Sequence, residues 1–443
     1  MNSEIKQRIK QIKNGEIPDG YRSTKAGVLP KWDCVHLNQI AEPITKKVGN
    51  GTYETLSISA GIGFVNQAKK FGKELSGKQY EKYTVLNRGD FSYNKGNSKS
   101  YLQGCIYRLK DRETAAVPNV FESFKIKNDS PDYYEQLFTS GYLNKQLSKK
   151  INHGVRDNGL LNLTEKDFYS CYVPHPPIAE QQKIAEILMQ CDKLIELYQN
   201  ETDELQKLKK ICLCNMFPKN GNDIPKWRFP QFTDAWEQRK LGNALISLQN
   251  NTLARADLSN ETGLAKNVHY GDVLIKFGEV LDVSKAQLPM IADEKILTKY
   301  KASFLQNGDV IVADTAEDTT VGKCSEIVGL NDEVVLSGLH TIPYRPVEKF
   351  AAGYLGYYLN SSAYHNQLIP LMQGIKVTSI SKSAMQDTDI VYPKSKEEQA
   401  KIGVYFRNLD NIITLHQRKL AGMEKQKKSL TQLLLTGIVR VSV

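Results

Sequence analysis

Two long stretches of the 443-residue sequence carry apolar side chains at alternating steps of three and four. The first, residues 177–217, begins at a Pro-Pro pair and is stopped by Pro218; the second spans residues 395–436. This spacing places the apolar side chains on one face of a helix that packs lengthwise on another helix. We therefore predict two paired helices, each about 60 Å long. Their predicted seam comprises Ile184, Ile187, Leu194, Leu205, Leu208, Ile402, Leu409, Ile413, Leu420 and Leu430.

The two stretches are copies of one another. Identical residues return at a constant offset of 218 positions, and both copies carry proline or capping signals at their starts. Chance similarity between two charged helices does not explain such ungapped identity, so we predict an internal duplication. The repeated residues include Glu180-Gln181 and Glu398-Gln399, Lys183-Ile184 and Lys401-Ile402, Asp192 and Asp410, and Lys209 and Lys427.

Each long helix follows a block with short alternating strands, polar loops and a few helices. Both blocks open on a Trp and a Leu five residues apart, at Trp32 and Trp236. The predicted fold class is α+β: two mixed α/β domains separated by two long helices packed as an antiparallel coiled coil, with a pseudo-two-fold internal repeat. The predicted parts are an N-terminal helical segment (1–20), a first block (21–176), a first helix (177–217), a second block (218–394), and a second helix with its tail (395–443).

The sequence lacks the motifs of several enzyme classes. It contains no G-x-x-x-x-G-K-[ST], no [DN]-P-P-[YF] and no H-E-x-x-H, and the triplet Asp293-Glu294-Lys295 has no upstream Pro-Asp of a nuclease. The seven cysteines form no C-x-x-C pair, which favours reduced, buried thiols over a metal site. We therefore predict no catalytic and no metal-binding residues, against the alternative of a self-sufficient nuclease or methyltransferase.

The net charge of +10 suits a nucleic-acid partner, although many proteins of similar charge bind none. No run of eighteen apolar residues exists, and the first residues lack the apolar core of a signal peptide. We expect a cytoplasmic protein without a membrane partner.

Polar and basic loops recur in both blocks. Lys and Arg suit phosphates and guanine, while Asn and Gln suit adenine. For each single residue, the alternative of a solvated surface loop stays open. Arg156 and Lys376, each two residues after a matched glycine, are the best candidates for phosphate contacts. The candidate DNA-binding residues are Lys69, Lys70, Lys95, Asn97, Lys99, Arg156, Asn250, Lys266, Lys323, Gln373, Lys376 and Ser379.

Together with this layout, several stretches make the chain resemble the specificity subunit of type I restriction–modification enzymes. They are FTDAWEQRKLG (232–242), GDVIVADTAEDTTVGK (308–323), GLHTIPYRP (338–346), the EQ-x-KI helix starts and LLLTGIVRV (433–441). The resemblance implies that the two blocks are target recognition domains and that the helices are conserved spacers. It also implies that residues 1–20 pack near the end of the second helix.

The resemblance further implies a DNA-binding protein that is not itself an enzyme. Its expected partners are double-stranded DNA, two methylation subunits docked on the spacer, and restriction subunits that join through them. S-adenosylmethionine, ATP and Mg²⁺ are expected in those partner subunits and not in this chain. Two different blocks held about 34–36 Å apart would read a bipartite, asymmetric target, which the methylation subunit modifies at adenine N6. The alternative is a coiled-coil adaptor that joins two protein-binding blocks.

Overall fold

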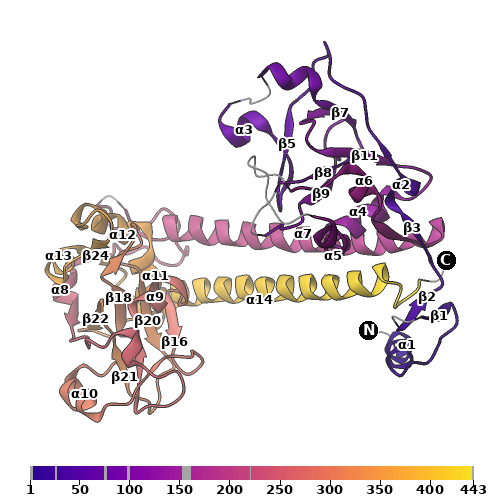
Figure 1. The fold of residues 1–443 in the computed structure, drawn as a ribbon. Coiled ribbons are helices and arrows are strands. Elements are labelled where there is room, and N and C mark those ends of the chain that lie inside the picture. The colour runs from indigo at the N-terminus through magenta and orange to yellow at the C-terminus, as the bar shows by residue number, and fades with distance from the viewer. Residues whose placement is uncertain are drawn as a thin grey trace. The chain divides into compact units, whose positions relative to one another are not determined.

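Two long helices, each preceded by a block of short strands and helices, make up the computed structural model (Figure 1). The structure describes residues 3–24, 27–73, 77–96, 100–151, 161–219 and 221–441. Helix α7 spans Ile178–Asn215 and helix α14 spans Lys396–Leu435. The chain divides into two compact units, of which unit 1 comprises Met1–Leu197 with Lys419–Val443 and unit 2 comprises Tyr198–Arg418. Each unit therefore contains a part of both long helices.

Unit 1 consists of short antiparallel strands covered by short helices. A four-stranded sheet has the order β4-β11-β8-β9 (Ala41–Pro43, Glu122–Ile126, Phe91–Asn94, Cys105–Arg108). The two-stranded pairs are β1-β2 (Tyr21–Thr24, Gly27–Pro30), β3-β12 (Asp33–His36, Tyr172–His175), β5-β6 (Leu56–Ser59, Gly63–Asn66) and β7-β10 (Thr84–Asn87, Thr114–Val117). The helices are α1 (Ser3–Lys13), α2 (Leu37–Ile40), α3 (Gln67–Phe71), α4 (Pro131–Thr139), α5 (Asn144–Lys150) and α6 (Glu165–Tyr169), with a 3₁₀ turn at Gly77–Lys82.

Unit 2 is built on a mixed five-stranded sheet with the order β14-β22-β18-β20-β16 (Leu245–Ser247, Thr341–Pro346, Val310–Ala313, Cys324–Val328, Val280–Asp282). A three-stranded sheet has the order β17-β15-β21 (Met290–Ile291, Ala265–Val268, Val335–Ser337), and the pairs are β13-β24 (Glu237–Lys240, Asp389–Tyr392) and β19-β23 (Thr315–Ala316, Thr378–Ser379). The helices are α8 (Leu241–Ala244), α9 (Tyr270–Ile275), α10 (Glu294–Lys299), α11 (Tyr354–Asn360), α12 (Ser362–Leu368) and α13 (Lys382–Gln386). Short 3₁₀ turns lie at Arg255–Asp257, Lys301–Ser303 and Ile369–Leu371. The predicted mixture of α and β structure is confirmed.

The two blocks begin and end with matching strand pairs. Strand β3 pairs antiparallel with β12 in unit 1, and β13 pairs antiparallel with β24 in unit 2. The amide of Leu37 donates to the carbonyl of Cys171 and the amide of Leu241 donates to that of Thr388, both at 2.8 Å. The first and last strands of each block therefore meet in the same way.

The repeated glutamates start the long helices in buried clusters of matching composition. In unit 1, the Glu180 carboxylate accepts the indole N–H of Trp32 at 3.0 Å and both nitrogens of the Arg440 fork at 2.6 Å. Glu180 is 2% exposed, and the Arg440 guanidinium lies over the Trp32 ring at 5.4 Å. Because the carboxylate is bonded on both oxygens, its burial is compensated. We call these three residues the helix-start cluster of unit 1.

Unit 2 contains the same arrangement around Glu398. Its carboxylate accepts the indole N–H of Trp236 at 3.3 Å and two bonds from the Arg228 guanidinium at 2.7 and 2.8 Å. The paired carboxylate raises the pKa of Arg228, which stays charged. In both clusters the arginine comes from the segment that follows the other long helix. The start of one helix is thereby fastened to the end of its partner within each unit.

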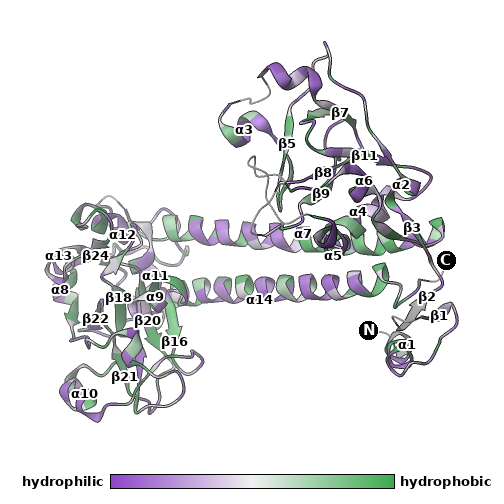
Figure 2. Cartoon of the chain, in the orientation of Figure 1, coloured by the Kyte–Doolittle hydropathy of each residue, from purple (hydrophilic) through white to green (hydrophobic). Residues whose placement is uncertain are grey.

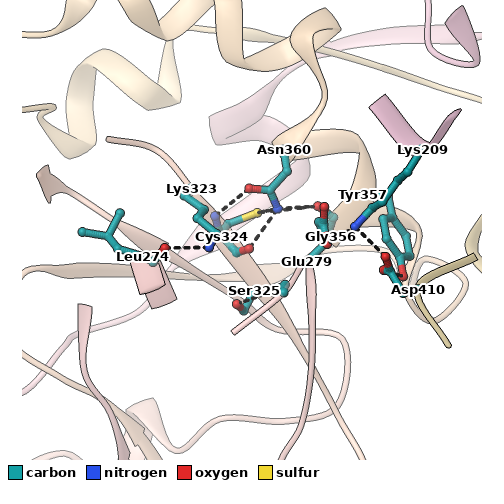
Figure 3. A network of polar contacts seen from close by, with 11 residues as sticks. Lys209, Leu274, Glu279, Lys323, Cys324, Ser325, Gly356, Tyr357, Asn360 and Asp410 are labelled. Carbon is teal, nitrogen blue, oxygen red and sulfur yellow. Dashed lines mark hydrogen bonds and ion pairs between the residues drawn. The ribbon is translucent and has the colours of Figure 1, made fainter. Parts of the chain in front are cut away.

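A second set of repeated residues joins the helices through ion pairs. In unit 1, Asp192 of α7 pairs with Lys427 of α14, and in unit 2 Lys209 of α7 pairs with Asp410 of α14 at 2.7 Å. Lys209 also binds Glu279 at 2.8 Å (Figure 3). Burial lowers the pKa of Lys209, but the two carboxylates raise it by more, so the ammonium remains charged.

The order of the contacts gives the direction of the helices. In unit 1, Glu180 meets Arg440 beyond the end of α14, whereas the later residue Asp192 meets the earlier Lys427. In unit 2, the Cys212 sulfur lies 3.3 Å from the hydroxyl of Tyr405, whereas the earlier residue Lys209 meets the later Asp410. The helix segments are therefore antiparallel inside each unit.

Burial along the predicted seam is uneven, although apolar positions recur along both helices (Figure 2). Ile184, Ile402, Leu409 and Ile413 are buried, and Ile187, Leu205, Leu420 and Leu430 are partly buried. The prediction was wrong for Leu194 and Leu208, which are 48% and 41% exposed. The two most deeply buried of these residues, Ile184 and Ile402, belong to the hydrophobic cores of the blocks, because two helices alone cover only a narrow stripe of each other. Leu194 lines an open groove of about 570 Å³ with Cys191, Met423, Leu430 and Leu433.

The N-terminal segment contacts the tail that follows α14. The hydroxyl of Tyr21 donates to the carbonyl of Ile438 at 2.8 Å, and Arg440 donates to the carbonyl of Gly20 at 3.3 Å. Gly20 and Tyr21 therefore contact the tail after α14, while packing of the rest of residues 1–20 near the end of the second helix stays a prediction.

Glu326 provides a test of how unit 2 is stabilised. Its buried carboxylate accepts the amides of Gly353 and Gly356 at the start of α11, at 2.7 and 2.9 Å. Burial raises the pKa of Glu326 from 4.5 to about 7. Because the folded state binds this proton more tightly, the contribution of Glu326 is greatest below pH 4.5 and is lost as pH rises through about 7.

Glu326→Gln is therefore expected to remove a pH dependence of about 3 kcal/mol in the free energy of unfolding between pH 4.5 and 7. The measurement is hydrogen exchange of unit 2 in the full chain across this pH range. Glu397→Gln, a change at an exposed carboxylate of the same unit, is the control. Parallel pH profiles for wild type and Glu326→Gln would contradict the assignment.

Candidate nucleic-acid interface

Three polar loops of the second block, which contain the predicted residues Asn250, Lys266 and Lys323, converge on a turn at residues 338–340. The Asn250 amide donates to the carbonyl of Gly338 at 3.2 Å, and the Gly338 amide donates to the carbonyl of Val268 at 2.9 Å. The amide of Asp314 donates to the carbonyl of His340 at 3.2 Å. We define the loop face of unit 2 as residues 249–251, 266–270, 314–323, 338–341 and 373–382.

The 373–382 loop joins the loop face of unit 2 through Asp314. The Ile380 amide donates to the carbonyl of Asp314 at 2.9 Å, and β19 pairs antiparallel with β23. Pairing of β18 with β22 brings Ala313 opposite Thr341, which places the 314–323 loop beside the turn. The sequence could not predict this convergence, because the pairing joins segments far apart in the chain.

His340 is a functional candidate that the prediction missed. Its backbone φ is 57°, which is uncommon for a residue other than glycine but more frequent for histidine. The half-exposed imidazole stacks edge-on against Tyr270, with ring centres 5.3 Å apart, and its Nδ1 lies 3.6 Å from the Asp314 carboxylate. The signal was present, since His340 lies inside the GLHTIPYRP stretch. An imidazole held in this way can donate to or accept from a base edge.

Buried polar side chains support the turn from below. The Asn251 amide donates to the side-chain oxygen of Asn267 at 2.7 Å and to the carbonyl of Ser337 at 2.9 Å. The hydroxyls of Ser337 and Thr341 lie 2.6 Å apart. All four side chains are almost completely buried. These hydrogen bonds hold the turn from below, while the side-chain nitrogen of Asn267 is buried without a partner among the described residues.

A hollow of about 480 Å³ opens on the loop face. Its polar lining includes Gln249, Asn250, Lys299, Asp314 and Lys382. Amides can pair with adenine, a carboxylate can accept from cytosine, and lysines can bind guanine or phosphate. The arrangement therefore combines groups that read base edges with groups that neutralise a phosphate backbone.

Two of the predicted lysines have partners inside unit 2. Lys266 donates to the carbonyl of Val283 at 2.9 Å and pairs with Glu333 at 3.1 Å. Lys323 donates to the carbonyl of Leu274 at 2.7 Å (Figure 3), and burial lowers the pKa of its ammonium. DNA contact by either residue stays a prediction. The sequence shows that these lysines lie in polar loops, but it does not show that backbone carbonyl groups of unit 2 accept hydrogen bonds from their ammonium groups.

Gln373, Lys376 and Ser379 lie in an exposed hairpin. The backbone groups of Gln373 and Ser379 exchange two hydrogen bonds, at 2.9 and 2.8 Å, and all three side chains are exposed. Among the predicted residues of unit 2, these three and Asn250 therefore lie on the loop face with access to a ligand.

The predicted residues of the first block are not brought together in the same way. Lys69 and Lys70 are exposed on α3, where the Lys70 ammonium donates to the carbonyl of Ile58 at 3.2 Å. Lys95 pairs with Glu122 and donates to the carbonyl of Leu163 at 3.4 Å. Asn97, Lys99 and Arg156 lie outside the described residues. The candidate interface is therefore defined only for unit 2.

Two further features concern only the part of the chain that the structure describes. No helix in it has the length and apolar character needed to cross a membrane. No three side chains of His, Cys, Asp or Glu type are grouped in it so that they could hold a metal ion.

Comparison with known proteins identifies the class. The model of the type I restriction modification DNA specificity domain matches residues 119–207 and 236–425, more than half of the chain. The chain therefore belongs to this family of type I restriction–modification DNA specificity proteins. It is 26% identical over 323 residues to the type I restriction enzyme MjaVIII specificity subunit of Methanocaldococcus jannaschii, covering 72% of each chain. The family favours a DNA specificity subunit over the adaptor alternative.

Solved structures with a similar fold agree with this class. One is a type I restriction–modification system S subunit from M. genitalium, with a TM-score of 0.51 and 12% identity over 91% of this chain and 96% of that chain. Another comes from work titled "Structural basis underlying complex assembly and conformational transition of the type I R-M system", with a TM-score of 0.56 and 16% identity over 93% and 99%. At these identities the likeness concerns the fold alone.

Proposed function

We propose that this chain recognises a bipartite, asymmetric DNA target and positions methylation subunits on it, without catalysing a reaction itself. The observation that carries the proposal is the contrast between repeated and unrepeated residues. The helix-start clusters around Glu180 and Glu398 have matching contacts. The loop face of unit 2 uses residues, such as those of the 338–340 turn, that lie outside the repeat. These contacts support one repeated framework that carries a different binding surface in each unit, of which the loop face of unit 2 is the one defined.

The spacer in this proposal is the antiparallel coiled coil predicted for α7 and α14. Its ion pairs Asp192–Lys427 and Lys209–Asp410 support an antiparallel register, because each pair joins a repeated Asp to a repeated Lys. Two different surfaces on such a spacer would read two different half-sites separated by unread base pairs.

The expected partners are two methylation subunits, with restriction subunits joined through them. S-adenosylmethionine would belong to the methylation subunits, and ATP and Mg²⁺ to the restriction subunits. A methylation subunit that modifies adenine N6 must extrude the base from the duplex. The role of this chain would be to place that subunit over the correct adenine in a cytoplasmic complex.

A map of methylated adenines tests the proposal. DNA is sequenced from cells that express the cognate methylation subunit with or without this chain. We expect a split, asymmetric methylated motif that is absent without the chain. Recovery of a stable complex that binds no specific DNA and methylates none would contradict the proposed function. Methylation by this chain alone would contradict its non-catalytic role.

A further inference from the structure

The tip of the 373–379 hairpin presents aliphatic side chains to solvent on an otherwise polar face. Ile375 is 100% exposed and Val377 is 54% exposed, with the exposed Lys376 between them. Exposing a complete isoleucine side chain at a loop tip gains nothing for folding. Exposed isoleucines such as Ile275 also occur elsewhere in unit 2, so exposure alone does not indicate a partner. At this tip, however, two aliphatic side chains flank a lysine on the loop face of unit 2.

The hairpin holds this tip in a defined conformation. Gly374 has a φ of 113°, and a Cβ atom on it would lie 2.0 Å from the carbonyl oxygen of Val377. The strand residue Thr378 pairs with Ala316, and the next residue but one, Ile380, is buried. A tip fixed at its base loses little conformational entropy when it binds.

The size and surroundings of the tip fit duplex DNA better than a protein. Two aliphatic side chains supply far less than the roughly 1,000 Å² that a specific protein interface requires. Single Ile, Leu or Phe side chains, in contrast, act as wedges between base pairs. Lys376 at the tip and Lys382, which follows the hairpin, can bind phosphates, while Glu317 and Asp318, which follow β19, disfavour phosphates beside that strand. The apolar tip is then the part suited to the base stack.

We propose that Ile375, supported by Val377, is a wedge that inserts at one base step within or beside the half-site read by unit 2. This inference rests on the proposed function. It adds that the ease with which a base step unstacks contributes to the choice of DNA sequence. Partial unstacking is least costly at pyrimidine–purine steps such as TA and CA. The chain would therefore prefer such a step at the wedge even without a hydrogen bond to its bases.

The test uses the complex of the full chain with its methylation subunit, and duplex DNA carrying the motif found by methylation mapping. 2-Aminopurine is placed in turn at each adenine position in and around the half-site that unit 2 reads, since its fluorescence rises on unstacking. Extrusion of the methylated adenine raises the fluorescence at that position with every variant. Apart from that position, we expect wild type to raise the fluorescence at one further step. Ile375→Ala should abolish this rise and weaken binding about tenfold, whereas Ile375→Leu should retain both.

Two matched variants separate insertion of Ile375 from phosphate binding and from a general loss of exposed apolar surface. Lys376→Ala should keep the fluorescence rise but reduce the salt dependence of binding by about one ion. Ile275→Ala removes another largely exposed isoleucine of unit 2 and should change neither quantity.

The outcomes distinguish the two proposals. Specific DNA binding with equal fluorescence and affinity for wild type and Ile375→Ala would overturn the wedge and leave the proposed function intact. Loss of the methylation subunit from Ile375→Ala would also overturn it, because the tip would then be a protein contact. Failure of the wild-type complex to bind any specific DNA would overturn both.

Discussion

Replacing Glu398 with alanine is expected to destabilise unit 2 by about 3–5 kcal/mol. The substitution removes the carboxylate that binds both nitrogens of the Arg228 fork and the indole of Trp236. The Arg228 guanidinium has a side-chain exposure of only 12%, so it would remain as a nearly buried charge without its partner. The free energy of unfolding can be followed by hydrogen exchange at the start of α14 and in β13.

The neighbouring Glu397 provides the control. It pairs with Lys401 four residues later on the exposed face of α14, where such pairs contribute about 0.3–0.5 kcal/mol. Glu397→Ala should therefore change stability by less than about 0.5 kcal/mol. A similar small effect for Glu398→Ala would refute the role assigned to the helix-start cluster.

The repeat makes the same prediction a second time. Glu180→Ala should destabilise unit 1 by a comparable amount, since Glu180 binds Arg440 and Trp32 in the corresponding geometry. Loss of protection should be greater in the unit that carries the substitution than in the other. If either variant lost the same amount of hydrogen-exchange protection in both units, the claim that each cluster stabilises its own unit would be contradicted.

The long helices were predictable because their signal is local and repeated. Apolar periodicity and prolines placed the first helix at residues 177–217, and the structure has Ile178–Asn215. The ungapped offset also identified Glu180, Asp192 and Lys209 as members of the repeat, although not their contacts. Their arginine partners escaped notice, because Arg228 and Arg440 follow their helices at different distances and so do not share the offset.

The loop face was only partly predictable. Residue type directed attention to the loops that contain Asn250 and Gln373, but it did not distinguish exposed loop lysines from those with a partner inside unit 2. Lys323 is instead bound to the carbonyl of Leu274, a partner that only the folded sheet supplies. The 338–340 turn was overlooked because its importance arises from strand pairing between β18 and β22, which no local pattern encodes.

The same contacts specify how the block of unit 2 can be exchanged without disturbing the helices. A replacement of residues 241–388 by the corresponding segment of another specificity subunit keeps Trp236, the β13-β24 pair and the Glu398 cluster. Because the replaced segment contains the whole loop face, we expect one half of the methylated motif to change and the other half to remain. For about three read base pairs, affinity for the original half-site should fall more than about a hundredfold.

The repeat supplies the reciprocal exchange as a control. Residues 37–171 of unit 1 correspond to this segment, since Leu37 bonds to Cys171 as Leu241 bonds to Thr388. Exchanging them should change the opposite half of the motif in the same methylation map. A chimera that forms the complex but alters both halves, or neither, would contradict independent reading by the two units. Opposite halves changing in the two chimeras would instead mean that specificity resides in the exchanged segments and that the retained helix-start clusters serve as the common framework.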